Sequence, residues 1–554
     1  MRGNVPQREI RRRHGFSFTI CWIFLFLCVL SGCVDSRTRE EEKSDPIPRE
    51  GGVYRIPLLN NPKSFDPIRA EDLYSTAVVY QLFDGLVKFS SDLLVIPSLA
   101  ESWQIGENGL VYRFFLRKNA YFHNGTPITS RDVVFSLTRL IKADPAPSVL
   151  PYMLKILGAD EYRTGRTDTL AGVLAVDDHS VEIRLKEPCA PFLAALGMHH
   201  SRIVPRDEVI KRGESFASNP VGSGPFAFVS WENNRSVRLK RFPEYYLKSA
   251  FVDEVEYVIY PGGKFEDVFA DFQAHKLHEM PAYDGKIRNQ LLSVEGVKLL
   301  RRPAVNLQFY GMNCHDPALS HPALRRALSL ALDRPSLVSR VYEDRFEIAR
   351  SLIPPGITGY DPENLRVEDN LSKAREELKK LPPGILDNGL TLEVVSSIQS
   401  PVAIAEAEFI AECWKKIGVT LKPRFIPDWS EFEKYVQSPA MQIYRYVWYM
   451  DIPDPDNILQ VLFGSDSKVN YIRYRNPDVD RALLDGRRML NPAERAKIYQ
   501  KIENIIVYDL PIIPLVHLNI DQAYQSNVNG IELNALGRHK TSLHQVWLSS
   551  SENK

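Results

Sequence analysis

Residues 97–140, PSLAESWQIGENGLVYRFFLRKNAYFHNGTPITSRDVVFSLTRL, contain the stretch that decides the fold. Thr129 and Asp132 stand at the spacing of a capping box, in which the two side chains satisfy the first backbone N–H groups of a helix. After this start, apolar side chains recur on one helical face: Val133, Leu137, Leu140 and Ile141. The pattern predicts a surface helix that packs against the protein through a single stripe.

Similar signals elsewhere predict further helices and strands. Pro322 opens a helical pattern, HPALRRALSLALDRPSLV, which Pro335 interrupts. A helix over about 402–417 stops at Gly418 and passes into VTLKPRFI, which has the pattern of a strand. Near the end, PAERAKIYQKIENIIVYDLP predicts a helix and IIPLVHLN a buried strand. Because strands and helices alternate irregularly, we predict a mixed α/β protein with discontinuous domains.

Length and composition narrow the function. A chain of 554 residues is too long for one ordinary core, so two or three domains are expected. Lys plus Arg and Asp plus Glu number 69 each, which gives no reason to propose nucleic acid as a partner. The sequence contains no nucleophile elbow, HExxH motif, phosphate loop or dinucleotide fingerprint. We therefore predict neither an enzyme nor a cofactor.

The N-terminus has the features of an export signal. Several arginines precede an apolar run, FSFTICWIFLFLCVL, that is too short for a comfortable transmembrane helix. The run ends in Leu-Ser-Gly-Cys33, which resembles a bacterial lipobox, whose cysteine is acylated; the alternative is a signal peptide with an incidental cysteine. We predict a lipoprotein signal peptide over 1–32 and a flexible, charged tether over 33–50.

The stretch 97–140 resembles the signature region of the extracellular solute-binding proteins of the peptide/nickel class, which capture ligands for ATP-driven importers. Further matching blocks occur in the family's order: GGVYRIPL, NPVGSGPFAFVSW, YGMNCHDPALSHPALRRALSLALDR, WYMDIPDPDN and LPIIPLVHL. The resemblance extends from about residue 51 to the C-terminus. Several independent blocks in the right order are far less probable by chance than any one of them.

The resemblance implies a two-lobed clamshell. One lobe would combine a discontinuous domain (51–94, 218–305 and 519–554) with an inserted domain (95–217). The other lobe would be the segment 306–518. The chain would cross between the lobes near 305 and 518, and these crossings would form the hinge. A monomer is expected, with permease subunits of the importer and a membrane, through the lipid on Cys33, as its partners.

The block WYMDIPDPDN (448–457) places three carboxylates among two prolines. It lacks the glycine and the final glutamate of a calcium loop, so no metal is predicted there. The prolines predict a rigid turn, with Asp454 and Asp456 either solvated or capping the next element. Asp451 instead ends the strand-like run YRYVWYM. Alternation along a strand puts Arg445 and Asp451 on one side, about 20 Å apart, which is the scale of a short extended peptide.

In the oligopeptide-binding members of the family, an aspartate at the position of Asp451 receives the peptide's α-ammonium, and an arginine at the position of Arg445 can contact the peptide's terminal carboxylate. The resemblance implies the same roles for Asp451 and Arg445. The backbone of Val447 and Tyr449 would pair with the peptide as an added strand, which is indifferent to side-chain identity. The family also implies ligand-facing positions at Glu71 and Leu73. Trp429 is expected to form the wall of a pocket for a ligand side chain.

Structural alternatives remain for three of these residues. Asp451 could cap the strand end, Arg445 could form a surface ion pair, and Trp429 could belong to the core. The binding role of Asp451 requires that no lysine or arginine of the protein already satisfies it.

Two departures from the family pattern affect the ligand. Dipeptide-binding members carry an arginine where this chain has Ser400, which disfavours a strict dipeptide receptor. The small residues that flank the acceptor aspartate are here Val447, Tyr449 and Met450, whose bulk could narrow the groove. The leading hypothesis is a lipid-anchored peptide receptor of the cell envelope, periplasmic or extracytoplasmic. A receptor for a nickel chelate, an oligosaccharide or an opine is the alternative, and an envelope hydrolase or assembly factor is the remote one.

Overall fold

The computed structural model describes residues 47–282, 285–363, 367–387 and 389–549. The predicted signal peptide, Cys33 and most of the predicted tether lie outside these residues. Within the described part of the chain, no helix combines the length and the apolar character that a membrane span requires.

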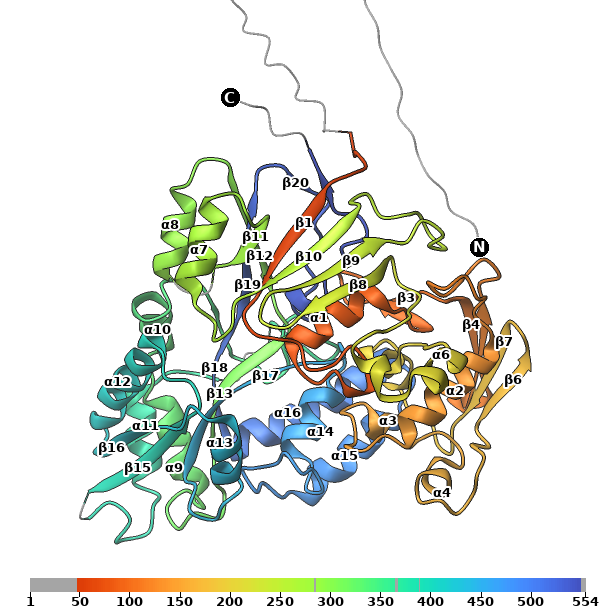
Figure 1. Ribbon diagram of the computed structural model, residues 1–554. Coiled ribbons are helices and arrows are strands. Elements are labelled where there is room, and N and C mark those ends of the chain that lie inside the picture. The colour runs from red at the N-terminus through yellow and green to blue at the C-terminus, as the bar shows by residue number, and fades with distance from the viewer. Residues whose placement is uncertain (1–46, 283–284, 364–366, 388, 550–554) are drawn as a thin grey trace, which may run out of the picture. The chain divides into compact units, whose positions relative to one another are not determined.

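Four sheets of three or more strands organise the described chain (Figure 1). The first has the order β1 (Val53–Leu58), β10 (Glu254–Ile259), β9 (Ser236–Arg241), β8 (Phe226–Glu232). The second has the order β11 (Glu279–Pro281), β19 (Asn519–Gln525), β12 (Val297–Pro303). The third has the order β4 (Ala100–Gly106), β5 (Val111–Leu116), β7 (Ser180–Arg184), β6 (Val173–Asp177).

The fourth sheet has six strands and carries the residues of interest. Its order is β14 (Glu347–Ile348), β18 (Ile512–His517), β13 (Asn306–Met312), β17 (Ile443–Tyr449), β15 (Leu390–Ser396), β16 (Val419–Phe425). Strand β13 runs antiparallel to both β17 and β18, whereas β15 runs parallel to β16 and β17. Short two-stranded pairs complete the strands: β2 (Val87–Phe89) with β3 (Val95–Pro97), and β20 (Val528–Asn529) with β21 (Trp547–Leu548).

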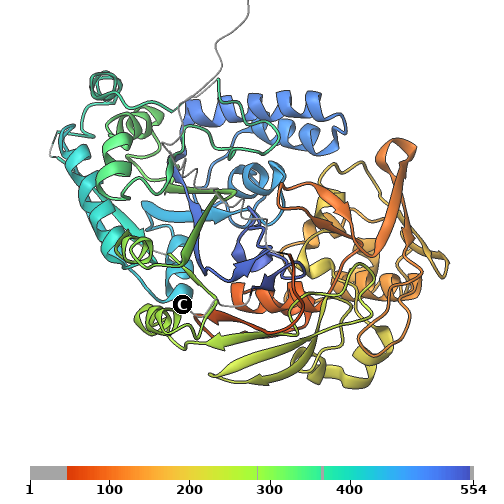
Figure 2. The ribbon, with the colours of Figure 1, turned by 90° about the horizontal axis from the view of Figure 1, so that it is seen from above.

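The helices surround these sheets. In the first half of the chain they are α1 (Leu73–Leu82), α2 (Ser130–Ile141), α3 (Leu150–Met153), α4 (Ala159–Arg163), α5 (Phe192–Ala195), α6 (Arg206–Arg212) and α7 (Phe265–Gln273). In the second half they are α8 (Gly285–Leu292), α9 (Pro322–Leu330), α10 (Arg334–Arg340), α11 (Leu371–Leu378), α12 (Pro401–Lys415), α13 (Trp429–Val436), α14 (Asp456–Phe463), α15 (Pro477–Arg488) and α16 (Pro492–Asp509). Helices α15 and α16 pack side by side and are the blue pair in Figure 2.

The predicted elements and the α/β class are confirmed. Helix α2 begins after Thr129, whose backbone N–H donates to the Asp132 carboxylate at 2.9 Å, and its predicted stripe is buried. Helix α12 ends near Gly418, which has a positive φ, and β16 follows directly. Strand β18 is buried along its whole length. In each case a local signal was enough, because capping, period and chain reversal are properties of a few neighbouring residues.

The two predicted crossings between lobes lie side by side. Strand β12 ends and β13 begins on either side of residues 304–305, and β18 gives way to β19 at Leu518. Asn306 ties the crossings together, because its side-chain oxygen accepts from the Leu518 N–H at 2.7 Å and its amide donates to the Leu518 carbonyl at 3.0 Å. A hinge here remains a proposal, which this pairing supports.

The predicted domain boundaries also remain a proposal. The first, second and third sheets draw their strands from the predicted first lobe and its inserted domain, and the six-stranded sheet lies wholly within 306–518. One apolar core, however, contains residues of the inserted domain, such as Phe192, together with Ile458 and Leu459 of the second lobe. The inserted domain, although predicted as part of the first lobe, therefore also packs against the second predicted lobe.

Candidate ligand-binding site

Strand β17 presents an open edge at its C-terminal half. On one side it pairs with β13 over its whole length, from Met312 opposite Ile443 to Asn306 opposite Tyr449. On the other side, its register with β15 covers only Ile443 and Tyr444. No strand of the described chain pairs with residues 446–449 on that second edge.

The backbone groups of Val447 and Tyr449 face this open edge. Met450 N–H donates to the Val305 carbonyl at 3.0 Å, so Met450 directs its backbone groups toward β13. Adjacent residues of an antiparallel strand alternate between the two edges. Val447 and Tyr449 therefore direct their N–H and C=O groups away from β13, where an extended ligand could bind as a further strand.

Asp451 follows the strand at this edge, and its side chain is 35% exposed. Its N–H donates to the Asn457 side-chain oxygen at 2.8 Å, which fixes the chain where the strand ends. The prediction that no lysine or arginine of the protein lies at this acid is wrong, but the acid is only half satisfied, because Lys540 contacts a single oxygen of the carboxylate. Lys540 Nζ lies 3.3 Å from Asp451 Oδ1 and 3.3 Å from the Asp451 carbonyl oxygen. Asp451 Oδ2 accepts no hydrogen bond within the described chain.

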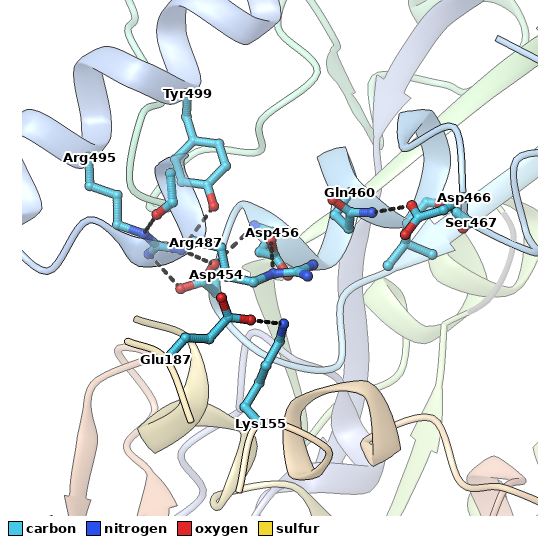
Figure 3. A network of polar contacts seen from close by, with 12 residues as sticks. Lys155, Glu187, Asp454, Asp456, Gln460, Asp466, Ser467, Arg487, Arg495 and Tyr499 are labelled. Carbon is cyan, nitrogen blue, oxygen red and sulfur yellow. Dashed lines mark hydrogen bonds and ion pairs between the residues drawn. The ribbon is translucent and has the colours of Figure 1, made fainter. Parts of the chain in front are cut away.

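Asp454 and Asp456 are buried, so the prediction that they are solvated is wrong. The Arg495 guanidinium donates to both oxygens of Asp454, each at 2.7 Å, and Arg487 donates to Asp456 at 3.1 and 3.0 Å (Figure 3). Burial raises the pKa of Asp456, and the Arg487 charge opposes this rise. Asp454 Oδ1 also accepts the Asp456 N–H at 2.9 Å, which is the one capping contact of the predicted kind.

These two ion pairs hold the turn that positions Asp451. They attach residues 452–457 to α15 and α16, which carry Arg487 and Arg495. Asn457, at the end of the turn, then accepts from Asp451 through its side chain and from the Trp448 indole through its carbonyl, at 2.9 Å. The three carboxylates thus separate into two anchors and one acid that remains partly exposed.

The same network reaches the predicted inserted domain. Glu187 accepts from Lys155 at 2.5 Å (Figure 3). It also accepts from Arg488 at 2.6 Å, and the Ala190 N–H donates to the Arg487 carbonyl at 2.8 Å. The hydrogen bond from Lys155 and the Arg488 charge lower the pKa of Glu187 to about 2. Helix α15 is therefore bonded both to the turn after Asp451 and to the inserted domain.

Arg445 lies in the interior, not at the open edge. Its Nε donates to the two oxygens of Glu406, at 2.9 and 3.0 Å, and its Nη2 donates to the Gln308 side-chain oxygen at 3.0 Å. Glu406, on α12, is fully buried and also accepts from the Tyr342 hydroxyl at 2.7 Å. Burial acts to lower the pKa of Arg445, but the Glu406 charge outweighs it, so the pKa is raised. The ion-pair alternative holds for this arginine, in a buried form.

The remaining predicted positions are accessible. Tyr449 is 55% exposed, Leu73 59% and Trp429 52%, so the core alternative for Trp429 is wrong. The Trp429 ring contacts Tyr446 of β17 with ring centroids 6.0 Å apart. Glu71 precedes α1 and accepts from His200 Nε2 at 3.0 Å. Their contacts with a ligand remain a prediction.

Two of the family departures have a structural explanation. Ser400 caps α12, because its hydroxyl accepts from the Ala403 N–H at 3.2 Å. Met450 is buried, so its bulk does not narrow the open edge as predicted. Of the three large residues that replace small ones, only Val447 and Tyr449 lie where they could limit the ligand.

Sequence reasoning missed Lys540 and Glu406. Lys540 is 89 residues after Asp451, in the 3₁₀ helix Arg538–Lys540, and no local pattern connects the two. Glu406 occupies an inward position of α12, where a carboxylate within an otherwise apolar stripe could have indicated a buried partner. The described residues contain no group of three or more His, Cys, Asp or Glu that could hold a metal ion.

Comparison with known proteins matches most of this chain to one protein family and to two relatives along most of their length. The family described as "Bacterial extracellular solute-binding proteins, family 5 Middle" matches residues 95–470. The dipeptide-binding protein of Escherichia coli is 26% identical over 505 residues, covering 86% of this chain and 92% of the relative. Heme-binding protein A of Haemophilus influenzae is 28% identical over 474 residues, covering 82% of this chain and 85% of the relative.

A solved structure has the same fold. The periplasmic binding protein DppA of Helicobacter pylori, an ABC transporter-associated protein solved with the peptide STSA, matches with a TM-score of 0.73 and 26% identity. The match covers 90% of this chain and 98% of that protein. The predicted periplasmic-binding-protein fold is therefore confirmed.

Proposed function

We propose that this chain, which belongs to family 5 of the bacterial extracellular solute-binding proteins, captures peptides outside the cytoplasm and delivers them to the permease of an ABC importer. Members of this family bind solutes and do not catalyse reactions. The names of two relatives, the E. coli dipeptide-binding protein and the H. pylori protein solved with a peptide, support a peptide ligand.

The observation that carries the proposal is the unpaired edge of β17 at Val447 and Tyr449. A peptide bound there would satisfy its own N–H and C=O groups with those of the strand, whatever its side chains are. Its N-terminus would lie at the Asp451 end of the strand, where Oδ2 is available to an ammonium group. Leu73, Trp429 and Tyr449 would supply apolar contacts, and Glu71 a polar one. Ser400, in place of an arginine, favours peptides longer than two residues.

Acetylation of the peptide amine is expected to weaken binding. The protein is incubated with a random pool of short peptides and with the same pool after N-acetylation, and retained peptides are quantified by mass spectrometry. We expect the free-amine pool to be retained about ten-fold better, because acetylation removes the charge that Asp451 would accept. Asp451→Asn should abolish this difference.

Asp478→Asn is the matched control, because Asp478 is an exposed aspartate of α15 and should leave the difference unchanged. Retention of neither pool would contradict the peptide proposal. Mass spectrometry of ligand that co-purifies with the protein would then show whether a nickel chelate, an oligosaccharide or an opine is bound.

Lipidation at Cys33 is the proposed means of attachment to the membrane. The lipobox-like Leu-Ser-Gly-Cys33 and the charged residues after it support this proposal. Two acyl chains on the cysteine would hold the protein stably at the membrane, which a single chain does not do. Labelled palmitate should be incorporated into the wild-type chain and not into Cys33→Ser, with Cys28→Ser, in the apolar run, as the matched control. Incorporation into Cys33→Ser would show that the lipobox assignment is wrong.

A further inference from the structure

Lys540 is a buried lysine whose only hydrogen-bond partners in the described chain are two oxygens of Asp451. Both contacts measure 3.3 Å, which is long for a hydrogen bond from an ammonium group. The lysine thus contributes its charge to Asp451 without forming a tight pair. Half of the carboxylate, Oδ2, stays available.

The segment that carries Lys540 is held firmly on the first predicted lobe. Gln81 of α1 donates to the Thr541 carbonyl at 3.0 Å and accepts from the Leu543 N–H at 3.0 Å. On the other side, Arg538 donates to the buried Glu279 through Nε at 2.7 Å. Lys540 therefore cannot leave Asp451 by a local movement of its backbone without breaking these contacts.

Within the described chain, Lys540 forms an ion pair with Asp451 and with no other carboxylate. His539, next to it, has a pKa well below the usual value because of burial and of the Lys540 and Arg538 charges. His199 has a similarly lowered pKa, caused by burial and then by His200 and Lys540. Both imidazoles are therefore neutral near pH 7, and Arg538 is already paired with Glu279. Asp451 is the acid toward which the lysine charge is directed.

An ammonium group that binds to Asp451 would therefore lie close to a cation already in place. Two like charges that share one carboxylate repel each other, and this repulsion is strong where water is largely excluded. We propose that Lys540 is a specificity-determining residue that weakens the preference of this site for a free N-terminal amine. Ligands with a neutral group at this end are correspondingly better accepted. The inference rests on the proposed peptide-binding function.

The test compares retention of the free-amine and acetylated peptide pools by the wild type and by Lys540→Met. We expect the preference for free amines to rise by about ten-fold in Lys540→Met, because the repulsion is removed while Asp451 is retained. Lys540→Arg should keep the wild-type preference, since it keeps the charge. The double variant Lys540→Met/Asp451→Asn should show no preference.

Lys240→Met, which changes an exposed lysine of β9, is the matched control and should behave as wild type. An unchanged preference in a folded Lys540→Met variant would overturn the inference while leaving peptide binding intact. The same holds if Lys540→Arg behaves like Lys540→Met, because the effect would then not depend on charge. If neither pool is retained by any variant, the peptide proposal itself fails and the inference falls with it.

Discussion

Replacing Arg495 with methionine is expected to lower the free energy of unfolding by about 3–5 kcal/mol. The substitution removes both hydrogen bonds from the guanidinium to Asp454, a buried residue of the turn after Asp451, and leaves its carboxylate with only the Asp456 N–H as a donor. It also removes the bonds from Arg495 to the Gly486 carbonyl, at 2.8 Å, and to the Tyr499 hydroxyl, at 3.0 Å. Urea unfolding followed by far-UV circular dichroism measures the change.

Two further variants identify the cause. The double variant Arg495→Met/Asp454→Leu should recover much of the loss, because replacing both partners of a buried pair by apolar residues is often close to neutral. Arg481→Met is the matched control, since Arg481 is an exposed arginine of α15 whose ion pair with Asp478 measures 3.9 Å, and a loss below about 0.5 kcal/mol is expected. If Arg495→Met lost as little stability as the Arg481→Met control, the anchoring role of Asp454 would be contradicted.

The turn after Asp451 shows why part of the site could not be predicted from sequence. The prolines and the strand-like run before them are local, and they indicated a strand that ends in a rigid turn. The partners of Asp454 and Asp456 lie 41 and 31 residues further along the chain, in helices whose packing no short pattern specifies. A carboxylate in a proline-rich turn is usually solvated, and here tertiary contacts reversed that preference.

Arg445 shows a different limit. The family pattern assigned the backbone of Val447 and Tyr449 to an extended ligand, and these backbone groups face the unpaired edge of β17. Alternation along the strand put Arg445 and Asp451 on one side, because the period of a strand is fixed. Alternation does not say which side chains of that row reach solvent. The burial of Arg445 results from α12, which places Glu406 against β17, and the contact joins residues 39 apart in the chain. The family pattern assigned this arginine to a ligand, and the structure gives it a partner of its own.

Arg445→Met is therefore expected to destabilise the protein, with a loss of about 3–5 kcal/mol in the free energy of unfolding. The variant leaves Glu406 fully buried with only neutral donors, Gln308 at 2.9 Å and the Tyr342 hydroxyl at 2.7 Å. Because the raised pKa of Arg445 keeps the guanidinium charged throughout the neutral range, the loss should be similar at pH 6 and pH 8. Urea unfolding at both values checks this.

The binding measurement separates this structural role from a role in ligand recognition. If Arg445 met the peptide carboxylate, amidation of the peptide C-terminus would weaken binding to the wild type, and Arg445→Met would remove that effect. With Arg445 paired to Glu406, the ratio of affinities for free and amidated peptides should be the same in the wild type and in the folded fraction of Arg445→Met. Arg445→Met/Glu406→Leu, which removes both charges, should regain stability and show that same ratio. A variant of near wild-type stability that selectively loses peptides with a free carboxylate would restore the ligand role, because the Glu406 pair would then have to open when the peptide binds.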